Sequence, residues 1–360
     1  MLLMAVRSIC KVGPEELFRL FKDAELFQPR KKPFGVQADC KYESTSYAAV
    51  YNLMSNSNKL DEEARWKNAV VTVTLASVLE KKTSFFDGIP KDLVSDFKNF
   101  VAALILRHKE ALTSNIIELC GLQGWEGITP ASFYKYGKRN FARKVDDTEN
   151  VPYGVGIYPT AALINHSCDP NVIKMTHPTN GTLMIMTKRS MKAGEPVLRQ
   201  YSRSFGFQPL FRRQKILKGC YHFTCQCVAC KNRWPTLDEL RVRAPKFCCP
   251  TCSQKFTYVD KCDSNKFGKC LLQSPDWTCG MCKMQYSGRV LQEQLSKYQG
   301  LYDKNIDELA KINRPFVALE KLQEAINFME THCCPPYATW YRYTELVKYL
   351  FCIITFTSQA

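Results

Sequence analysis

The sequence lacks any long apolar run. It nowhere approaches the ~18 consecutive apolar residues that would span a bilayer. Residues 1–6 are apolar, but Arg7 follows before the apolar core of a secretory leader is complete. These absences argue against a membrane span and a signal peptide. They predict a soluble, intracellular protein without membrane attachment, located in the cytoplasm, the nucleus or both.

A dense run of lysine or arginine is also lacking, although basic residues are in large excess. The 50 Lys and Arg outnumber the 34 Asp and Glu, and the formal net charge is +16. Such a charge favours nucleic acid, anionic membranes or acidic proteins as partners without specifying any of them. Because no aromatic residues are interleaved along a Lys/Arg stripe, a solvated basic surface is the simplest interpretation. Direct nucleic-acid binding ranks last among the functions considered.

Cysteine is scarce in the first third of the chain and abundant later. Cys10 and Cys40 are the only cysteines before Cys120, whereas eleven of the 18 lie between Cys220 and Cys282. Many cysteines can indicate disulfides in a small secreted domain, but this chain is large and shows no leader. Their clustering in short C-x-C and C-x2-C steps favours metal binding over disulfides.

The size and composition predict a folded protein of two or more domains. The 360 residues are 45% hydrophobic and 12% aromatic, enough to bury a substantial core. Residues 1 to about 130 are expected to be mainly helical, with a helix at 14–25 that begins with a proline and two acids. At 60–81 a helix is expected, but a Val-Val-Thr-Val-Thr run leaves a strand as the alternative. The other predicted helices are 47–54 and 91–119, the second with one buried apolar stripe.

The pattern changes at Gly121. Glycines and prolines spread over 121–156 predict a long loop or insertion. Short strands are expected at 172–176, 182–187 and 195–200, with an Asn-Gly turn joining the first two as a hairpin. Helices are expected to follow at 209–219, 291–310, 316–332 and 339–354, and the last three are predicted to form a helical hairpin plus one helix.

One group of cysteines has the spacing C-x-C-x2-C: Cys225, Cys227 and Cys230. Three such ligands can wrap a zinc ion but leave its tetrahedron one ligand short. Cys168, which follows Asn165 and His166, is the candidate that we prefer for the fourth position. Taken alone, Asn165 and His166 could be a small polar cap. If Cys168 closes the site, the metal fixes the Asn-His segment beside the cysteine loop, and the space enclosed is the predicted active site.

A second group of cysteines has zinc-ribbon spacing: Cys249, Cys252, Cys279 and Cys282. The gap between its two pairs is somewhat longer than the usual template. Reduced surface thiols are therefore the alternative interpretation. Cys248, Cys262 and Cys270 could substitute as ligands.

In their order and spacing, these motifs resemble the SET domain with its post-SET zinc loop. The stretch Asn-His-Ser-Cys-x-Pro-Asn at 165–171 is followed by a Gly-Glu turn, by Tyr201, and by Tyr-x-Phe-x-Cys-x-Cys-x2-Cys at 221–230. More narrowly, the chain resembles the SET and MYND domain-containing protein lysine methyltransferases. Trp234-Pro235 and the later C-x2-C pairs look most like the tetratricopeptide-containing branch of that family. The final helices look like the start of its C-terminal helical domain.

The resemblance implies S-adenosyl-L-methionine-dependent methylation of a lysine on a histone or non-histone protein, with zinc as a second cofactor. Such a transfer is a direct displacement. It needs the lysine amine aligned with the methyl group, and a dry channel that lowers the lysine pKa. The implied catalytic residues are Tyr201 and Tyr221. The implied cofactor-binding residues are Asn115, Asn165, His166, Tyr201 and Phe223, with Asn140 as a weaker competitor of Asn115. The C-terminal helices are expected to offer a surface for protein partners.

The sequence departs from the family at two points. A Gly-Arg-Gly turn and a MYND finger are lacking, and Pro196 replaces the acid expected after Glu195. The sequence is therefore expected to correspond to a carboxy-terminal portion of a family protein, with weak or undetectable cofactor binding until the amino-terminal part is restored. The alternative function is a zinc-stapled scaffold that acts in protein–protein interaction and transcriptional regulation without catalysis.

These observations predict an α+β protein. The expected architecture is a SET-type fold of short twisted strands with a helical insert, zinc-bound cysteine loops and a C-terminal helical domain. The expected segments are a mainly helical insert region (1–130), the C-terminal half of the SET core (131–222), a post-SET zinc loop (223–232), a second cysteine-rich zinc-binding segment (233–289) and an incomplete helical domain (290–360).

Overall fold

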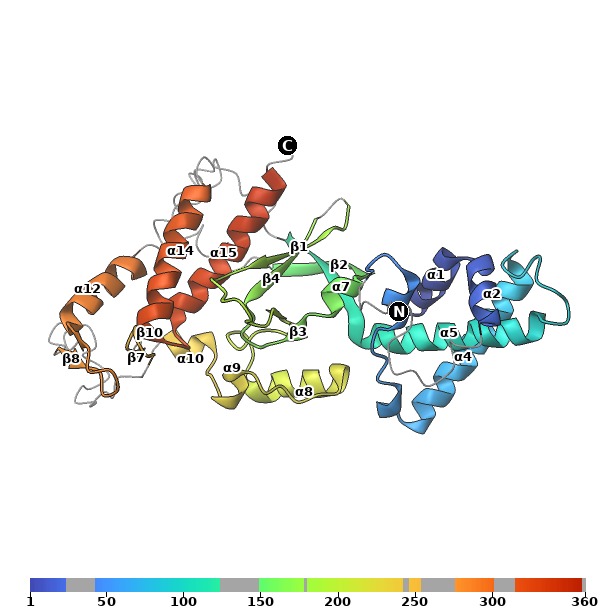
Figure 1. Cartoon of the computed structure of the whole chain (residues 1–360), viewed down its shortest axis with the longest axis horizontal. Coiled ribbons are helices and arrows are strands. Elements are labelled where there is room, and N and C mark those ends of the chain that lie inside the picture. The colour runs from blue at the N-terminus through green and yellow to red at the C-terminus, as the bar shows by residue number, and fades with distance from the viewer. Residues whose placement is uncertain are drawn as a thin grey trace. The chain divides into compact units, whose positions relative to one another are not determined.

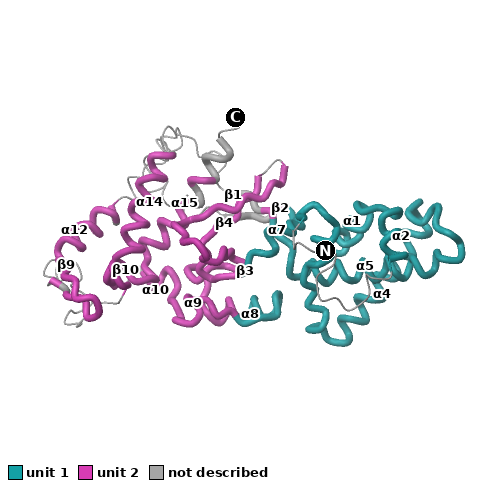
Figure 2. Tube along the Cα trace, in the orientation of Figure 1, with its two compact units in different colours: residues 1–118, 154–165, 215–224 teal, residues 119–153, 166–214, 225–360 magenta. Residues whose placement is uncertain are grey.

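The computed structural model describes residues 1–23, 43–123, 149–177, 180–241, 246–253, 276–300 and 315–357 (Figure 1). Its helices and short strands confirm the predicted mixed composition. The chain divides into two compact units (Figure 2): unit 1 comprises residues 1–118, 154–165 and 215–224, and unit 2 comprises residues 119–153, 166–214 and 225–360. The chain passes between the units repeatedly, so this division does not follow the five expected segments, which stay a prediction.

Unit 1 is built around the long helix α5 (Val94–Asn115). Phe97 of α5 makes edge contacts with Phe18 and Phe86 at ring-centroid distances of 5.3 and 5.5 Å. The predicted apolar stripe of this helix is buried at Phe97, Phe100, Val101, Leu104 and Ile105. The other described elements of unit 1 before α5 are α1 (Leu2–Val12), α2 (Pro14–Lys22), α3 (Tyr47–Tyr51), the 3₁₀ helix η2 (Ser57–Lys59) and α4 (Glu62–Lys82).

The helix α4 settles the choice between helix and strand at residues 60–81 in favour of a helix. Asp61 caps its first turn by accepting a hydrogen bond from the Ala64 N–H at 2.7 Å. Thr72 and Thr74 turn their hydroxyls back to carbonyls of the preceding turn, at 3.0 and 2.8 Å. These bonds satisfy the threonines inside a helix, so the β-branched run does not require a strand.

The predicted helix 91–119 ends four residues early, at Asn115. The Asn115 side-chain amide donates to the Ala111 carbonyl at 2.7 Å and to the Met54 carbonyl at 2.8 Å. It thereby occupies a carbonyl of the last turn, and the backbone becomes extended at Ile116. The helix α1 was not predicted, although buried Ala5 and Ile9 have helical spacing.

The expectation of a loop across 121–156 is wrong at both ends. Strand β1 (Ile116–Gln123) pairs with β2 (Glu149–Ile157) in a two-stranded sheet. Glycines in both segments suggested irregular structure, but pairing between distant segments leaves no local signal in the sequence. Residues 124–148, including Asn140, lie outside the described residues. The short helix α7 (Pro159–Ala162) follows β2.

A buried histidine in unit 1 makes stability sensitive to acid. His108 is almost fully buried and its Nε2 lies 2.8 Å from the Tyr47 hydroxyl. Burial, aided by the Arg107 charge, lowers the pKa of His108 to about 4. Below pH 6.5 the unfolded chain therefore binds a proton that the folded chain does not, so stability is lost as the pH falls toward 4. We expect a loss of about 2 kcal/mol from this group between pH 6.5 and 5.

The measurement is urea unfolding at several pH values. His108→Gln, which keeps a partner for Tyr47, should reduce this loss, and His177→Gln in the hairpin turn is the control. An unchanged pH slope in His108→Gln would contradict the assignment.

Unit 2 contains the predicted β-hairpin. Strand β4 (Val172–Thr176) pairs antiparallel with β5 (Leu183–Thr187), from Val172 opposite Thr187 to Thr176 opposite Leu183. Gly181 has φ of 69° in the turn, which is the conformation the Asn-Gly pair was expected to supply. The third predicted strand, 195–200, shrinks to β6 (Leu198–Arg199), which pairs with β3 (Asn165–His166).

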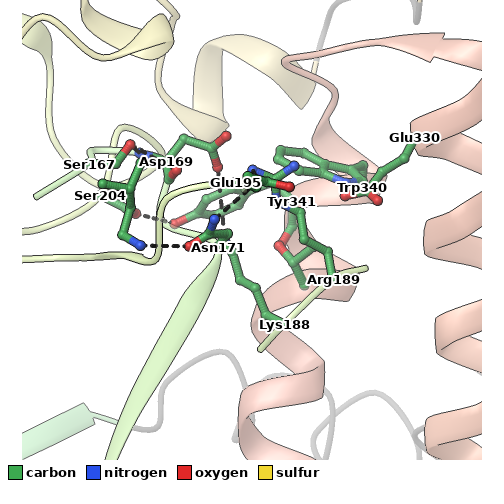
Figure 3. A network of polar contacts seen from close by, with 12 residues as sticks. Ser167, Asp169, Asn171, Lys188, Arg189, Glu195, Ser204, Glu330, Trp340 and Tyr341 are labelled. Carbon is green, nitrogen blue, oxygen red and sulfur yellow. Dashed lines mark hydrogen bonds and ion pairs between the residues drawn. The ribbon is translucent and has the colours of Figure 1, made fainter. Parts of the chain in front are cut away.

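Asn171 explains why that third strand is short (Figure 3). Its side-chain amide donates to Glu195 Oε1 at 3.1 Å and to the Pro196 carbonyl at 2.9 Å. Its Oδ1 accepts from the Leu198 N–H at 2.8 Å. A side chain thus takes the place of a neighbouring strand for this backbone, and Asn171 joins the start of β4 to the segment before β6.

Asn171→Ala is expected to destabilise unit 2 by about 3 kcal/mol, because it removes the side-chain partner of two backbone groups, the Pro196 carbonyl and the Leu198 N–H, and one hydrogen bond to Glu195. Asn180→Ala is a matched control, since Asn180 accepts one exposed hydrogen bond from Thr182 N–H at 2.9 Å. Urea unfolding of the two variants measures the difference. Equal effects would show that Asn171 does not have this role.

The later elements of unit 2 are mainly helical. Helix α8 (Leu210–Tyr221) begins here and confirms the helix predicted at 209–219. Helices α14 (Pro315–His332) and α15 (Ala338–Thr357) confirm two of the final predicted helices, and α12 (Gly288–Gln299) covers the described part of 291–310. The remaining elements are α9 (Val228–Lys231), α10 (Leu237–Arg241), β7 (Lys246–Phe247), β8 (Trp277–Thr278), β9 (Gln285–Tyr286) and β10 (Cys333–Cys334).

Helix α15 is joined to the loop after β6 by Tyr341 (Figure 3). The Tyr341 hydroxyl is hydrogen-bonded to Ser204, and its ring contacts Phe205 at a centroid distance of 5.0 Å. A Cβ added to Gly206 would lie 2.5 Å from the Tyr341 ring. Glycine at this position is therefore what allows the ring to approach the backbone.

Candidate functional site

The structure brings together the four cysteines of the first predicted group. Cys168 follows β3, Cys225 and Cys227 precede α9, and Cys230 lies within α9. Their sulfurs all lie within 4.8 Å of one another, and those of Cys168 and Cys230 are 3.5 Å apart. A zinc ion with four bonds of about 2.3 Å places its sulfurs about 3.8 Å apart. The four thiols therefore fit a tetrahedral zinc ion.

Two side chains at the start of α8 support this cluster. Gln214 donates to the Cys225 carbonyl and accepts from the Cys225 N–H, both at 2.9 Å. Arg213 is fully buried, donates to the Gln208 carbonyl and directs Nη2 toward Cys230 Sγ at 4.0 Å. Sequence analysis missed both residues, because a helix with several basic residues looks like a solvated one.

Within the cluster the pKa of Cys227 and Cys230 is lowered, whereas that of Cys168 and Cys225 is raised. A hydrogen bond from the Cys168 thiol lowers the pKa of Cys230 to about 7, and the same neighbour lowers the pKa of Cys227. The thiolate is the form of cysteine that binds a metal. Cys227 and Cys230 therefore have the chemistry that suits a bound cation, in addition to the geometry of the four sulfurs.

His166 connects this cluster to Tyr201. Its Nδ1 accepts a hydrogen bond from the Tyr201 N–H at 2.9 Å, and its Nε2 lies 3.4 Å from Cys168 Sγ. Burial lowers the pKa of His166 to about 4, so the ring is neutral at pH 7. Because Nδ1 accepts, Nε2 carries the proton and faces the sulfur. The ring of His166 is thus committed to internal contacts.

Tyr201 is half-buried beside this histidine. The two ring centroids lie 5.1 Å apart, and the Arg199 guanidinium stacks 4.2 Å from the Tyr201 ring centroid. Burial raises the pKa of Tyr201, so its hydroxyl stays protonated at neutral pH. Arg199 was not singled out from the sequence, where it looks like any strand residue.

His166 and Tyr201 belong to unit 2. The other predicted site residues belong to unit 1: Asn115, Asn165, Tyr221 and Phe223. Tyr221 and Phe223 form an edge-to-face pair with centroids 6.5 Å apart, and Asn165 is exposed. The two amide hydrogens of Asn115 are used by Ala111 and Met54, so Oδ1 is the atom left for a ligand. The assembly of these residues into one cofactor pocket stays a prediction.

The second group of cysteines also forms a cluster. The sulfurs of Cys249, Cys252, Cys279 and Cys282 lie within 4.8 Å of one another. Cys248 is not part of it, because its thiol is hydrogen-bonded to the Thr331 carbonyl at 3.7 Å. Cys262 and Cys270 lie outside the described residues.

Comparison with known proteins shows a match over part of the chain. Residues 35–202 match the SET domain. The match ends one residue after Tyr201 and includes Asn165, His166 and Cys168.

The chain is homologous to the SET and MYND domain-containing protein-lysine methyltransferases, as the resemblance predicted. It is 24% identical to the Homo sapiens protein-lysine N-methyltransferase SMYD4 over 279 residues, which cover 72% of this chain and 32% of that protein. The Danio rerio protein-lysine N-methyltransferase SMYD4 is 25% identical over 332 residues, which cover 82% of this chain and 40% of that protein. The Gallus gallus N-lysine methyltransferase SMYD2 is 34% identical over 100 residues, which cover 28% of this chain and 22% of that protein. SMYD4 is the tetratricopeptide-containing member.

The chain thus spans well under half the length of the SMYD4 proteins that it matches. Within the part of the chain that the structure describes, no helix combines the length and the apolar composition that crossing a bilayer requires.

Proposed function

We propose that the chain is part of an S-adenosyl-L-methionine-dependent protein-lysine N-methyltransferase with a SET-type fold. The observation that carries the proposal is the SET match together with the series Cys168, His166 and Tyr201, in which each residue fixes the next. We further propose a structural zinc ion held by Cys168, Cys225, Cys227 and Cys230, which would keep the Asn165-His166 segment in place.

S-adenosyl-L-methionine, when bound, supplies a methyl group on a sulfonium that a neutral lysine amine can displace. Tyr201 suits the task of orienting that amine, because its hydroxyl is protonated and its backbone is fixed by His166. Arg199 places a positive charge on one face of the Tyr201 ring. This charge disfavours a second cation there, and therefore favours the deprotonated lysine that the reaction needs.

Asn165 and the backbone of His166 would supply hydrogen bonds to the cofactor. The side-chain oxygen of Asn115, Oδ1, would supply one acceptor. Phe223, with Tyr221 at its edge, would stack on the adenine. Tyr221 would be the second hydroxyl at the amine. The substrate would be a lysine on a histone or non-histone protein, in the cytoplasm, the nucleus or both, with further protein partners on the C-terminal helices.

The alternative is a non-catalytic interaction scaffold, and one observation favours it. Pro196 stands where a second acid was expected, and the remaining acid, Glu195, is engaged by Asn171 and by Arg189 at 3.6 Å. Glu195, the one acid of this turn, would then be purely structural.

Calorimetric titration with S-adenosylhomocysteine separates the two functions when the amino-terminal part of a family protein is restored to the zinc-loaded chain, covalently or in trans. The enzyme requires a saturable site, whereas the scaffold requires none. The absence of heat at high micromolar ligand, with zinc content and folding confirmed, would favour the scaffold.

A further inference from the structure

The second cysteine cluster consists of two turns with the same local geometry. In the first, the Ser253 N–H donates to the Cys249 carbonyl at 2.7 Å, and in the second the Lys283 N–H donates to the Cys279 carbonyl at 3.0 Å. Ser253 and Lys283 both have φ of 58°, a left-handed conformation that is uncommon for non-glycine residues. In each turn the first cysteine is buried and the second is more exposed.

Each turn thus repeats the same backbone conformation and the same N–H to carbonyl hydrogen bond, and the four sulfurs of the two turns lie within 4.8 Å of one another. Two matching turns that bring their thiols together indicate a common ligand between them.

The sulfur positions fit a metal and not a pair of disulfides. Across the two turns, Cys249 and Cys282 are 3.4 Å apart, as are Cys252 and Cys279. A disulfide requires about 2.05 Å, whereas sulfurs around zinc are about 3.8 Å apart. The Tyr286 hydroxyl lies 3.4 Å from Cys249 Sγ and 2.9 Å from Thr251 Oγ1. It is placed to donate a hydrogen bond to a metal-bound thiolate.

The cluster lies where the C-terminal helices are anchored. Just before Cys249, β7 pairs with β10, which separates α14 from α15, and the Cys248 N–H donates to the His332 carbonyl at 2.8 Å. Just after Cys282, β9 leads into α12, whose Tyr298 bonds Glu324 of α14 at 2.9 Å. One side of the cluster is thus attached to the α14–α15 turn, and the other to α12.

We propose that Cys249, Cys252, Cys279 and Cys282 bind a second, structural zinc ion that holds α12, α14 and α15 together, with Tyr286 as a positioning residue. This ion does not depend on methyl transfer, so its failure and the failure of the enzymatic proposal are separate results.

The test is zinc analysis of the full chain purified with reductant and without chelator. The wild type should hold two zinc ions, Cys279→Ser one, and the exposed-cysteine control Cys10→Ser two. Hydrogen exchange should rise in residues 315–357 of Cys279→Ser and stay unchanged in residues 43–115. Because Cys279→Ser could fail to fold, Tyr286→Phe is the conservative second variant. It should keep two ions but bind one of them about tenfold more weakly.

Three results would overturn the proposal. One is a wild-type chain with a single zinc that Cys227→Ser removes. Another is a Cys249–Cys282 or Cys252–Cys279 disulfide found by alkylation and mass spectrometry. The third is a Tyr286→Phe variant that binds both zinc ions as tightly as the wild type.

Discussion

Cys168→Ser is expected to abolish binding of one zinc ion and to unfold the region around Cys168. A structural zinc site contributes on the order of 10 kcal/mol to folding, comparable to the whole stability of a domain. Cys168 is fully buried and holds the loop after β3 against α9, so a weaker ligand there removes both the metal and the contact. Zinc analysis and hydrogen exchange in residues 166–214 measure the two losses.

Cys220→Ser is the matched control, because Cys220 is exposed and lies outside both clusters although it is close to Cys225 in sequence. It should keep the full zinc content and the wild-type exchange pattern. Retention of all bound zinc by Cys168→Ser would mean that another residue is the fourth ligand.

Tyr201→Phe is expected to reduce methyl transfer about 10²-fold while changing cofactor affinity only a few-fold. The substitution removes the hydroxyl alone, and the contacts that position Tyr201 remain: its N–H bond to His166 and the Arg199 stack on its ring. Transfer of a labelled methyl group to core histones or lysine peptides gives the rate, with the amino-terminal part of a family protein restored to the chain. Titration with S-adenosylhomocysteine gives the affinity.

Tyr153→Phe serves as the control for this experiment, since Tyr153 is an exposed tyrosine whose hydroxyl bonds the His177 carbonyl at 3.4 Å. It should leave rate and affinity unchanged. Equal losses of rate and affinity in Tyr201→Phe would indicate a structural role, and an unchanged rate would remove Tyr201 from the mechanism.

The features that could be predicted from the sequence are those with a short-range physical signal. The spacing of Cys225, Cys227 and Cys230 places three thiols on one loop, and the need for a fourth ligand pointed to Cys168. The hairpin at β4 and β5 followed from the Asn-Gly turn between two short strand candidates.

The features that could not be predicted depend on contacts between distant segments. The early end of α5 depends on Met54, which lies far away in sequence and accepts from Asn115. The pairing of β1 with β2 joins segments on either side of residues 124–148. Arg213 is buried beside Cys230, yet in the sequence it is one more basic residue of a helix. Residue type and spacing do not reveal which polar group the fold encloses.

The ring of His166 has a consequence for how an inactive sample should be judged. One imidazole contacts both Cys168 and the backbone of Tyr201. If Cys168 binds the proposed zinc ion, we expect a chain without that ion to lose the support of Tyr201 as well. Such a sample would behave in an assay like a Tyr201 variant, although every residue of its sequence is intact. Zinc occupancy therefore has to be reported beside each rate before any preparation of this chain is described as lacking activity.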